Sequence, residues 1–268
     1  MSIPIETVQT DNFSMNFFRF GKGERTLVIL PGLSVQSVMS AADAVAGMYQ
    51  GLDELFTVYL FDRRTELPAV YSIEDMARDT AEAFRALGLK EVCLFGASQG
   101  GMIAQCIAAE YPELVGKLAL GSTSPRVTEE QYHAIEGWIR LAEDRDRVGL
   151  YLAFGEEIYP PAVFEQYRET LTTMAGTVTD AELDRFVTLA KAIRGFDITD
   201  KLDRIRCPVL AIGVYEDKVL GSDATMEIAE KLEGQTDARL YLYVGYGHAA
   251  YDTAPDYRDR LVRFFTQA

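Results

Sequence analysis

Three glycines surround a single serine in the stretch LFGASQGGM, residues 94–102. A serine hydroxyl is a weak nucleophile until a neighbouring base accepts its proton. The pattern Gly-x-Ser-x-Gly places such a serine on a strained turn between a strand and a helix. Glycine and serine also occur in ordinary turns, so the pattern needs a supporting context. Here an apolar strand is expected at 91–95 and a helix at 99–110, and this context favours Ser98 as a nucleophile.

Two histidines are available to act as the base. His248 lies in the segment VGYGHAAYD, directly after the last expected strand. Loops at the carboxyl ends of parallel strands are where α/β sheets bind their ligands. His133 falls in a predominantly polar helical stretch, where a surface or pocket-lining role is expected. The sequence therefore predicts His248 as the base.

The third group must be a carboxylate that orients the imidazole and stabilises its cation. The segment IGVYEDKVLGS offers Glu216, Asp217 and Asp223 after an expected strand at 208–213. We expect Asp217 to be the acid, with Glu216 as its rival. The segment GSTSPR, after an expected strand at 117–121, contains no acid. The resulting chain order, serine then aspartate then histidine, is the order that accompanies a nucleophile elbow.

Short apolar runs alternate with longer amphipathic segments on both sides of residues 125–200. This alternation predicts an α/β fold with a mostly parallel central sheet and helices on both faces. We expect strands at 26–30, 56–61, 91–95, 117–121, 208–213 and 238–245, and helices at 35–50, 72–87, 99–110, 222–233 and 255–266. Residues 3–20 read as two further short strands, by their alternation of apolar and polar residues.

Residues 125–200 carry helical patterns without a convincing strand. The sequence therefore predicts a core domain made of residues 1–124 and 201–268, interrupted by a helical cap at 125–200. The alternative is a second helical domain with an unrelated role.

The composition restricts the partners and the compartment. The chain has 268 residues and a formal net charge of −15, from 41 acidic against 26 basic residues. Nucleic acid and anionic membranes need a positive surface, so we expect neither as a partner. A small-molecule substrate is expected, and a homo-oligomer is left open. With two histidines and neither an HxH nor an HExxH spacing, no metal site is predicted, and no cofactor is expected.

Three cysteines, Cys93, Cys106 and Cys207, stand in or beside apolar segments without a CxxC spacing. They are expected to be buried free thiols, which indicates a reducing compartment. The first residues lack the basic and apolar regions of a signal peptide, and no run approaches the roughly 18 apolar residues of a membrane span. These observations predict a cytoplasmic protein.

The sequence resembles the α/β-hydrolase fold family, in particular its cap-bearing esterase and lactonase-like members. The resemblance covers nearly the whole chain and is most specific in GASQGGMIAQCIAAEYPELVGKLAL, GFDITDKLDRIRCPVLAIGVYEDKV and GHAAYDTAPDYRDRLVRFF. It implies Ser98 as nucleophile, Asp217 as acid and His248 as base. It also implies that the backbone amides of Leu33 and Gln99 form the oxyanion hole.

The chain departs from the family pattern at two places. Pro31-Gly32 stands where many members have His-Gly, and the loop after YLFD reads DRRTELPAV instead of a segment with several glycines and a serine. Neither departure touches the three residues of the expected triad. Both alter the rim of the pocket, so they bear on the substrate.

The resemblance and the residues together predict a serine hydrolase that cleaves carboxylic esters or lactones through an acyl-enzyme. Some large apolar side chains of the expected cap should pack its own core, and the rest should line a pocket for a small, largely apolar substrate; they are Trp138, Tyr151, Phe154, Tyr159, Phe164 and Phe186. The alternatives on the same fold are a C–C bond hydrolase, a lyase and a cofactor-free haloperoxidase-like enzyme. A receptor-like ligand-binding protein with a slow triad is a further alternative, because fold does not fix function.

Overall fold

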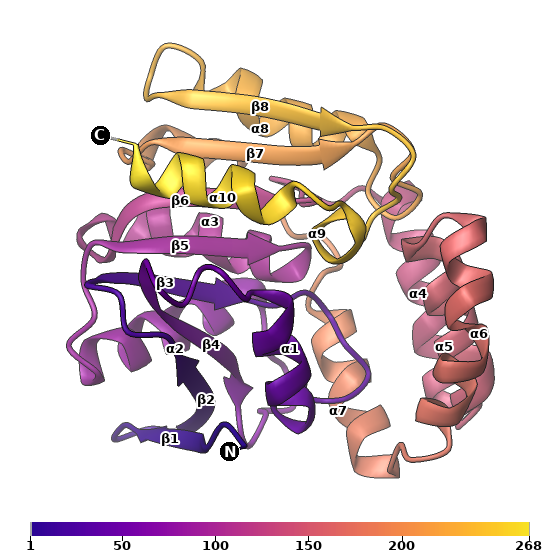
Figure 1. Cartoon of the computed structure of the whole chain (residues 1–268). Helices are drawn as coiled ribbons and strands as arrows, with labels where there is room; N and C mark the ends of the chain where they lie inside the picture. The colour runs from indigo at the N-terminus through magenta and orange to yellow at the C-terminus, as the bar shows by residue number, and fades with distance from the viewer. Residues whose placement is uncertain (1, 268) are drawn as a thin grey trace.

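An eight-stranded sheet forms the centre of the computed structural model, which describes residues 2–267 (Figure 1). The strand order is β1-β2-β4-β3-β5-β6-β7-β8. Strand β2 is antiparallel to both β1 and β4, and strands β3 to β8 are mutually parallel. The predicted mostly parallel sheet is thus confirmed. The strands are β1 (Ile5–Gln9), β2 (Ser14–Phe20), β3 (Arg25–Leu30), β4 (Phe56–Arg64), β5 (Val92–Ala97), β6 (Val115–Gly121), β7 (Val209–Val214) and β8 (Ala238–Tyr243).

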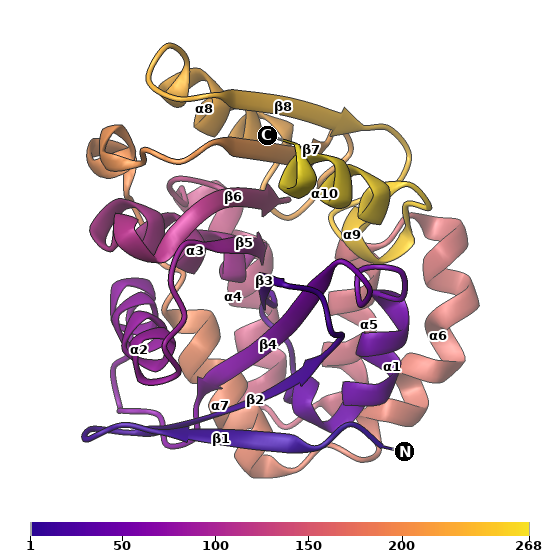
Figure 2. The same cartoon turned by 60° about the vertical axis from the view of Figure 1, so that its left-hand side comes forward.

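Helices cover both faces of this sheet (Figures 1 and 2). On β3, Val28 and Leu30 pack into the core on one face, and Leu27 and Ile29 pack into a second core on the other. Because both faces are buried, the strand is apolar at consecutive positions. The first face is covered by α2 (Ile73–Ala86), α3 (Gln99–Glu110) and α8 (Ser222–Leu232), and the second by α1 (Ala42–Met48) and α10 (Tyr257–Thr266).

The start of α2 shows how the sequence sets an element boundary. The Ser72 hydroxyl accepts a hydrogen bond from the Asp75 amide at 3.0 Å, and the Asp75 carboxylate accepts one from the Ser72 amide at 3.2 Å. This reciprocal capping box satisfies amides that the first turn leaves unpaired. The expected helix at 72–87 is therefore found, beginning one residue after its cap.

Two helices differ from the sequence-based expectation. The helix expected at 35–50 is divided into a 3₁₀ turn η1 (Val38–Ala41) and α1. Its start is fixed at Ser37, whose hydroxyl accepts a hydrogen bond from the Met39 amide. The helix α9 (Ala250–Thr253) was not expected, because four residues are too few for a helical period to show in a sequence.

Four helices make up most of the segment between β6 and β7: α4 (Glu129–Glu143), α5 (Arg147–Ile158), α6 (Pro161–Ala175) and α7 (Asp180–Lys191). We call residues 125–198 the insertion. It lies beside the carboxyl ends of the parallel strands, where the arrowheads of β5 and β7 point in Figure 1. Its two ends meet, because Val127 donates to the Phe196 carbonyl and Ile198 donates to the Pro125 carbonyl, both at 2.8 Å. After it, η3 (Thr199–Arg204) leads to β7.

Across residues 2–267, no helix combines the length and the apolar character that crossing a membrane requires.

Candidate active site

Ser98 joins β5 to α3 in a strained backbone conformation, with φ 50° and ψ −119°. A non-glycine residue with positive φ is uncommon and is held in place by its surroundings. Here the Ser98 amide donates to the Gly121 carbonyl at 2.8 Å, and its carbonyl accepts from the Thr123 hydroxyl at 2.7 Å. Bonds from the neighbouring strand β6 and its following loop therefore hold the serine at the tip of the turn.

The glycines around Ser98 are required by close approach of backbone segments. A Cβ on Gly96 would lie 2.4 Å from the Gly100 carbonyl oxygen, and a Cβ on Gly100 would lie 2.0 Å from the Leu30 carbonyl oxygen. A Cβ on Gly101 would lie 2.6 Å from Cβ of Thr123. Real Cβ atoms do not approach other atoms so closely, so side chains here would force α3 away from β3 and β6.

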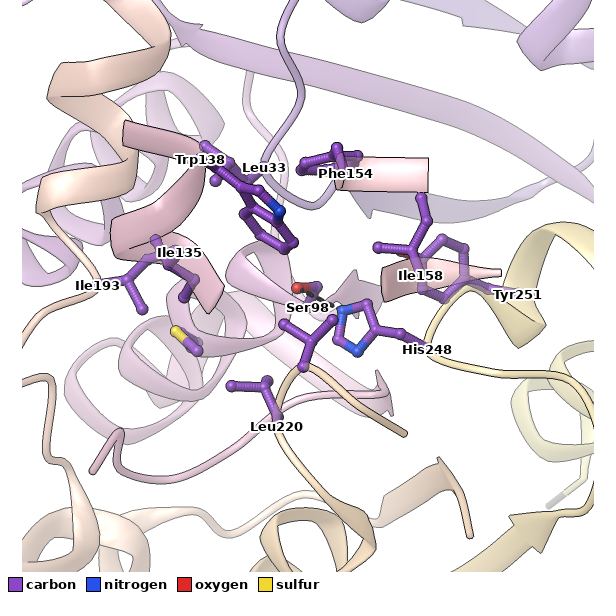
Figure 3. Close-up of a pocket in the computed structure, with 12 residues that line it drawn as sticks. Leu33, Ser98, Ile135, Trp138, Phe154, Ile158, Ile193, Leu220, His248 and Tyr251 are labelled. Carbon is purple, nitrogen blue, oxygen red and sulfur yellow. Dashed lines mark hydrogen bonds between the residues drawn. The ribbon is translucent and has the colours of Figure 1, made fainter. Parts of the chain in front are cut away.

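Ser98, His248 and Asp217 form one hydrogen-bonded chain. The Ser98 Oγ lies 2.9 Å from Nε2 of His248, and Nδ1 of His248 lies 2.9 and 2.8 Å from the two carboxylate oxygens of Asp217. Because a carboxylate only accepts, Nδ1 carries the proton and Nε2 is left to accept from the serine hydroxyl. Figure 3 shows Ser98 and His248 pointing toward one another at the cavity.

Asp217 is the acid that reaches the histidine among the three that the sequence offered. Its Oδ1 also accepts hydrogen bonds from the amides of Val219 at 2.9 Å and Leu220 at 3.0 Å, which fix its orientation. The rival Glu216 is exposed, and its carboxylate accepts from the Gly245 amide. Asp223 is exposed as well.

The second histidine lies elsewhere. His133 is exposed on α4 and does not line the cavity at Ser98.

The amides of Leu33 and Gln99 lie in the two segments that flank the serine. Gln99 is the first residue of α3, whose unpaired amides carry partial positive charge. Leu33 lines the cavity, and a Cβ on the preceding Gly32 would lie 3.2 Å from Cβ of Ser98. Within residues 2–267, neither amide donates to a protein acceptor. Both remain available to a ligand oxygen.

A narrow cavity with largely apolar walls opens onto Ser98 and His248. Its free volume is about 20 Å³, little more than one water molecule needs. Its lining includes no charged side chain. The sheet side contributes Leu33, Met102, Val219, Leu220 and Tyr251, and the insertion contributes Ile135, Trp138, Phe154, Ile158 and Ile193 (Figure 3).

Of the six large aromatic residues singled out in the insertion, Trp138 and Phe154 line the cavity. The others pack elsewhere: Phe186 is fully buried, and the Tyr151 hydroxyl donates to Gln36 at 3.0 Å. The aliphatic lining residues were not singled out from the sequence. Their helical spacing indicates only a buried face, and the contacts of that face depend on how the insertion sits on the sheet.

The three cysteines are free. Burial raises the pKa of Cys93 to about 11 and that of Cys207 to about 12, and it raises the pKa of Cys106 further. All three are therefore neutral thiols at neutral pH, and none lines the cavity.

Comparison with known proteins agrees with this architecture. Residues 25–255 match the sequence model of the alpha/beta hydrolase fold family, and the chain belongs to that family. It is 26% identical over 228 residues to the putative carbamate hydrolase RutD of Agrobacterium fabrum, covering 82% of this chain and 86% of that protein. It is 20% identical to the 3-oxoadipate enol-lactonase 2 of Acinetobacter baylyi, covering 80% of each chain.

Solved structures show the same fold. The alpha/beta hydrolase MGS-M2, from a Medee basin deep-sea metagenome library, superposes with a TM-score of 0.85 at 19% identity over 98% of both chains. The enol-lactonase of Burkholderia xenovorans superposes with a TM-score of 0.80 at 18% identity, covering 98% of this chain and all of that one. The named relatives are hydrolases, and the present chain is an enzyme of this hydrolase class.

Proposed function

We propose that this protein is a serine hydrolase that cleaves carboxylic esters or lactones of small, largely apolar substrates through an acyl-enzyme. The observation that carries the proposal is the hydrogen-bonded chain from Asp217 through His248 to Ser98, which opens onto an apolar cavity. A nucleophile, a base and an orienting acid in hydrogen-bond reach of one another are the parts that acyl transfer needs.

The mechanism follows from the atoms that face each other. Nε2 of His248 takes the proton of the Ser98 hydroxyl while Oγ attacks the acyl carbon. The amides of Leu33 and Gln99 donate to the oxyanion, and His248 then returns the proton to the leaving oxygen. A water molecule activated by His248 releases the acid from the serine. Asp217 keeps the imidazole in the required tautomer and stabilises its cation.

The cavity supports a neutral substrate. A carboxylate or phosphate group in the apolar part of the substrate would be buried without a cationic partner, which is costly. The insertion acts as a cap in this proposal, because half of the apolar walls come from it. The names of the two relatives, a putative carbamate hydrolase and an enol-lactonase, are compatible with cleavage at an acyl carbon. The free thiols support a reducing compartment, and a cytoplasmic location remains a prediction.

The first test is covalent labelling combined with ester turnover. A fluorophosphonate probe should add its mass to the peptide that contains Ser98, and the protein should hydrolyse p-nitrophenyl acetate or butyrate. Ser98→Ala should abolish labelling and reduce turnover by more than about 10³-fold, as removal of a triad member does. Ser122→Ala is the control, because Ser122 is also buried and its hydroxyl has no partner within the described residues.

Unchanged labelling in Ser98→Ala would contradict the assignment. Labelling of the wild type at Ser98 without turnover of any ester or lactone would instead favour the C–C hydrolase or receptor-like alternatives.

A further inference from the structure

Arg63 is a buried arginine whose burial no ion pair explains. It lies near the end of β4 and is 3% exposed. Charged side chains are almost never buried so completely unless they are paired. The adjacent Asp62 is occupied elsewhere, since its carboxylate accepts from Arg185 at 2.9 Å and from the Ser37 hydroxyl at 2.6 Å. Within residues 2–267, no carboxylate pairs with the Arg63 guanidinium.

The partners of this guanidinium are neutral oxygens at the candidate site. Its Nη2 donates to the Pro31 carbonyl at 2.8 Å and to the side-chain oxygen of Gln99 at 3.2 Å. Pro31 lies two residues before Leu33 in the loop after β3, and Gln99 directly follows Ser98. One nitrogen of Arg63 thus joins the two segments whose amides the proposed mechanism uses.

The Gln99 side chain continues the connection. Its amide nitrogen donates to the Leu189 carbonyl of α7 at 2.7 Å, and the whole residue is buried. Without Arg63, the part-buried Pro31 carbonyl and the buried Gln99 side-chain oxygen would each lose this donor. Such a loss costs about 1–3 kcal/mol for a buried group, so the segments would shift to find other partners.

We propose that Arg63 is a positioning residue that sets the spacing of the Leu33 and Gln99 amides and places a fixed positive charge behind the oxyanion hole. This inference rests on the proposed function of the same site. Oxyanion donors act within a narrow range, about 2.7–3.1 Å from the developing charge, so a displacement of a few tenths of an ångström weakens them. A buried cation adds a favourable field, because charges interact more strongly in a low dielectric.

The guanidinium keeps its charge at neutral pH. Burial lowers the pKa of Arg63 to about 10, and the nearby Asp62 partly offsets this effect. A base is protonated below its pKa, so the side chain remains a cation at pH 7.

The next residue provides a matched control. Arg64 lies 3.5 Å from the buried Asp79, its guanidinium packs over the Phe13 ring, and its Nη2 lies 3.4 Å from the Asn12 carbonyl. None of these groups lines the cavity. Removing Arg64 should therefore cost stability without disturbing the oxyanion amides.

The experiment compares Arg63→Met, Arg63→Lys and Arg64→Met with the wild type. For each we would measure kcat and KM for p-nitrophenyl butyrate, the rate of fluorophosphonate labelling and Tm. Arg63→Met should lower kcat about 10–100-fold, less than the 10²–10³-fold cost of losing a donor outright, with KM within about 3-fold. Arg63→Lys should recover part of the loss, because it retains the charge. Arg64→Met should keep kcat within about 3-fold even where its Tm falls.

Gln99→Leu serves if Arg63→Met does not fold, since it removes the acceptor and leaves the cation. Gln99→Leu should lower kcat about 10-fold. In a double variant with Arg63→Lys, the two losses in kcat should not multiply, because the two side chains act as a unit. The proposal is overturned if Arg63→Met lowers Tm while kcat and the labelling rate stay within about 3-fold of the wild type. Where Arg63→Met does not fold, the proposal is overturned if Arg63→Lys and Gln99→Leu both fold and leave kcat unchanged.

Failure of the proposed function gives a different result. A wild type that is labelled at Ser98 but turns over no ester would refute ester hydrolysis. The labelling rates would still decide the role of Arg63, since phosphonylation also places negative charge on an oxygen in the oxyanion hole. A wild type that is neither labelled nor active would refute both.

Discussion

The two walls of the cavity are built from different materials. On the sheet side, Ser98, Asp217 and His248 are joined by hydrogen bonds, and Ser98 is held in a strained turn. On the insertion side, the lining consists of aliphatic and aromatic side chains and includes no charged group. Polar geometry tolerates shifts of only a few tenths of an ångström, whereas apolar walls tolerate exchange of side chains of similar volume. The sheet should therefore fix the reaction and the insertion should select the substrate.

The two regions are connected at α7 by polar contacts. Arg185 pairs with Asp62 at 2.9 Å, with both side chains about four-fifths buried, and Gln36 donates to Glu182 at 3.2 Å. Together with the Gln99 bond to α7, these contacts fix one helix of the insertion against the sheet. Helices α4 and α5 are also bonded to the core, because the Gln131 side chain donates to the Leu220 carbonyl at 2.6 Å and the Ala249 amide donates to the Ile158 carbonyl at 3.0 Å. Their aromatic walls in addition contact one another, with the ring centroids of Trp138 and Phe154 4.5 Å apart.

Changing the acid should produce the largest effect on the sheet side. Asp217→Asn keeps the shape of the side chain but removes the carboxylate that fixes the histidine tautomer. We expect kcat to fall by about 10²–10⁴-fold, where the upper value is the fall in kcat for the same change in the serine-protease triad. The control is Glu216→Gln, which should stay within about 3-fold because that side chain bonds to Gly245 instead. The measurement is kcat of both variants and the wild type on one ester. A larger loss in Glu216→Gln would mean that the acid is misassigned.

Changing the insertion wall should alter preference and leave the chemistry intact. Trp138→Leu removes part of the wall that faces Ser98, and we expect the ratio of kcat/KM for p-nitrophenyl octanoate over butyrate to rise about 10-fold, the effect of about one methylene in an apolar pocket. Phe186→Leu is the control, because Phe186 is buried behind Phe154 and does not line the cavity. It should lower Tm without changing the ratio. Equal shifts in both variants would show that the insertion acts through its overall packing.

The strain at Ser98 predicts the smallest effect, and it concerns stability alone. A positive φ costs a non-glycine residue about 1–3 kcal/mol, while glycine loses about 0.5–1 kcal/mol more backbone entropy on folding. Ser98→Gly should therefore be about 1 kcal/mol more stable than Ser98→Ala, although both lack the hydroxyl. Urea unfolding of the two variants measures the difference. A more stable alanine variant would show that the turn is not strained.

The contrast between the two walls also explains what the sequence could predict. The glycines around Ser98 and the acids after β7 can be recognised in the sequence. Close backbone approach and acyl transfer each require particular residue types at fixed local spacing. The strands could be located because burial on both faces leaves continuous apolar runs. The contact between Asp217 and His248 depends only on the local turns that follow the neighbouring strands β7 and β8.

Arg63 and the aliphatic lining could not be found in this way. Arg63 lies where the pairing of β4 with β2 shifts register, since Phe17 pairs with Phe61 but Met15 pairs with Arg64, so period-two alternation does not indicate which way its side chain points. Its partners, Pro31 and Gln99, come from segments more than thirty residues away and are brought to it by strand order. For Ile135 and Ile193 likewise, helical spacing predicts burial, but the docking of the insertion decides which of its buried positions meet the serine.

The two backbone bonds that close the insertion give it the character of an exchangeable module. The chain leaves and rejoins the core at adjacent points, held by the bonds between Val127 and Phe196 and between Ile198 and Pro125. The entropy of closing such a loop grows only with the logarithm of its length, so long and short insertions cost nearly the same. Recombination at these two adjacent points would give the same sheet and triad a new substrate range in a single event, provided that the incoming segment supplies a carbonyl that accepts from the Gln99 side chain.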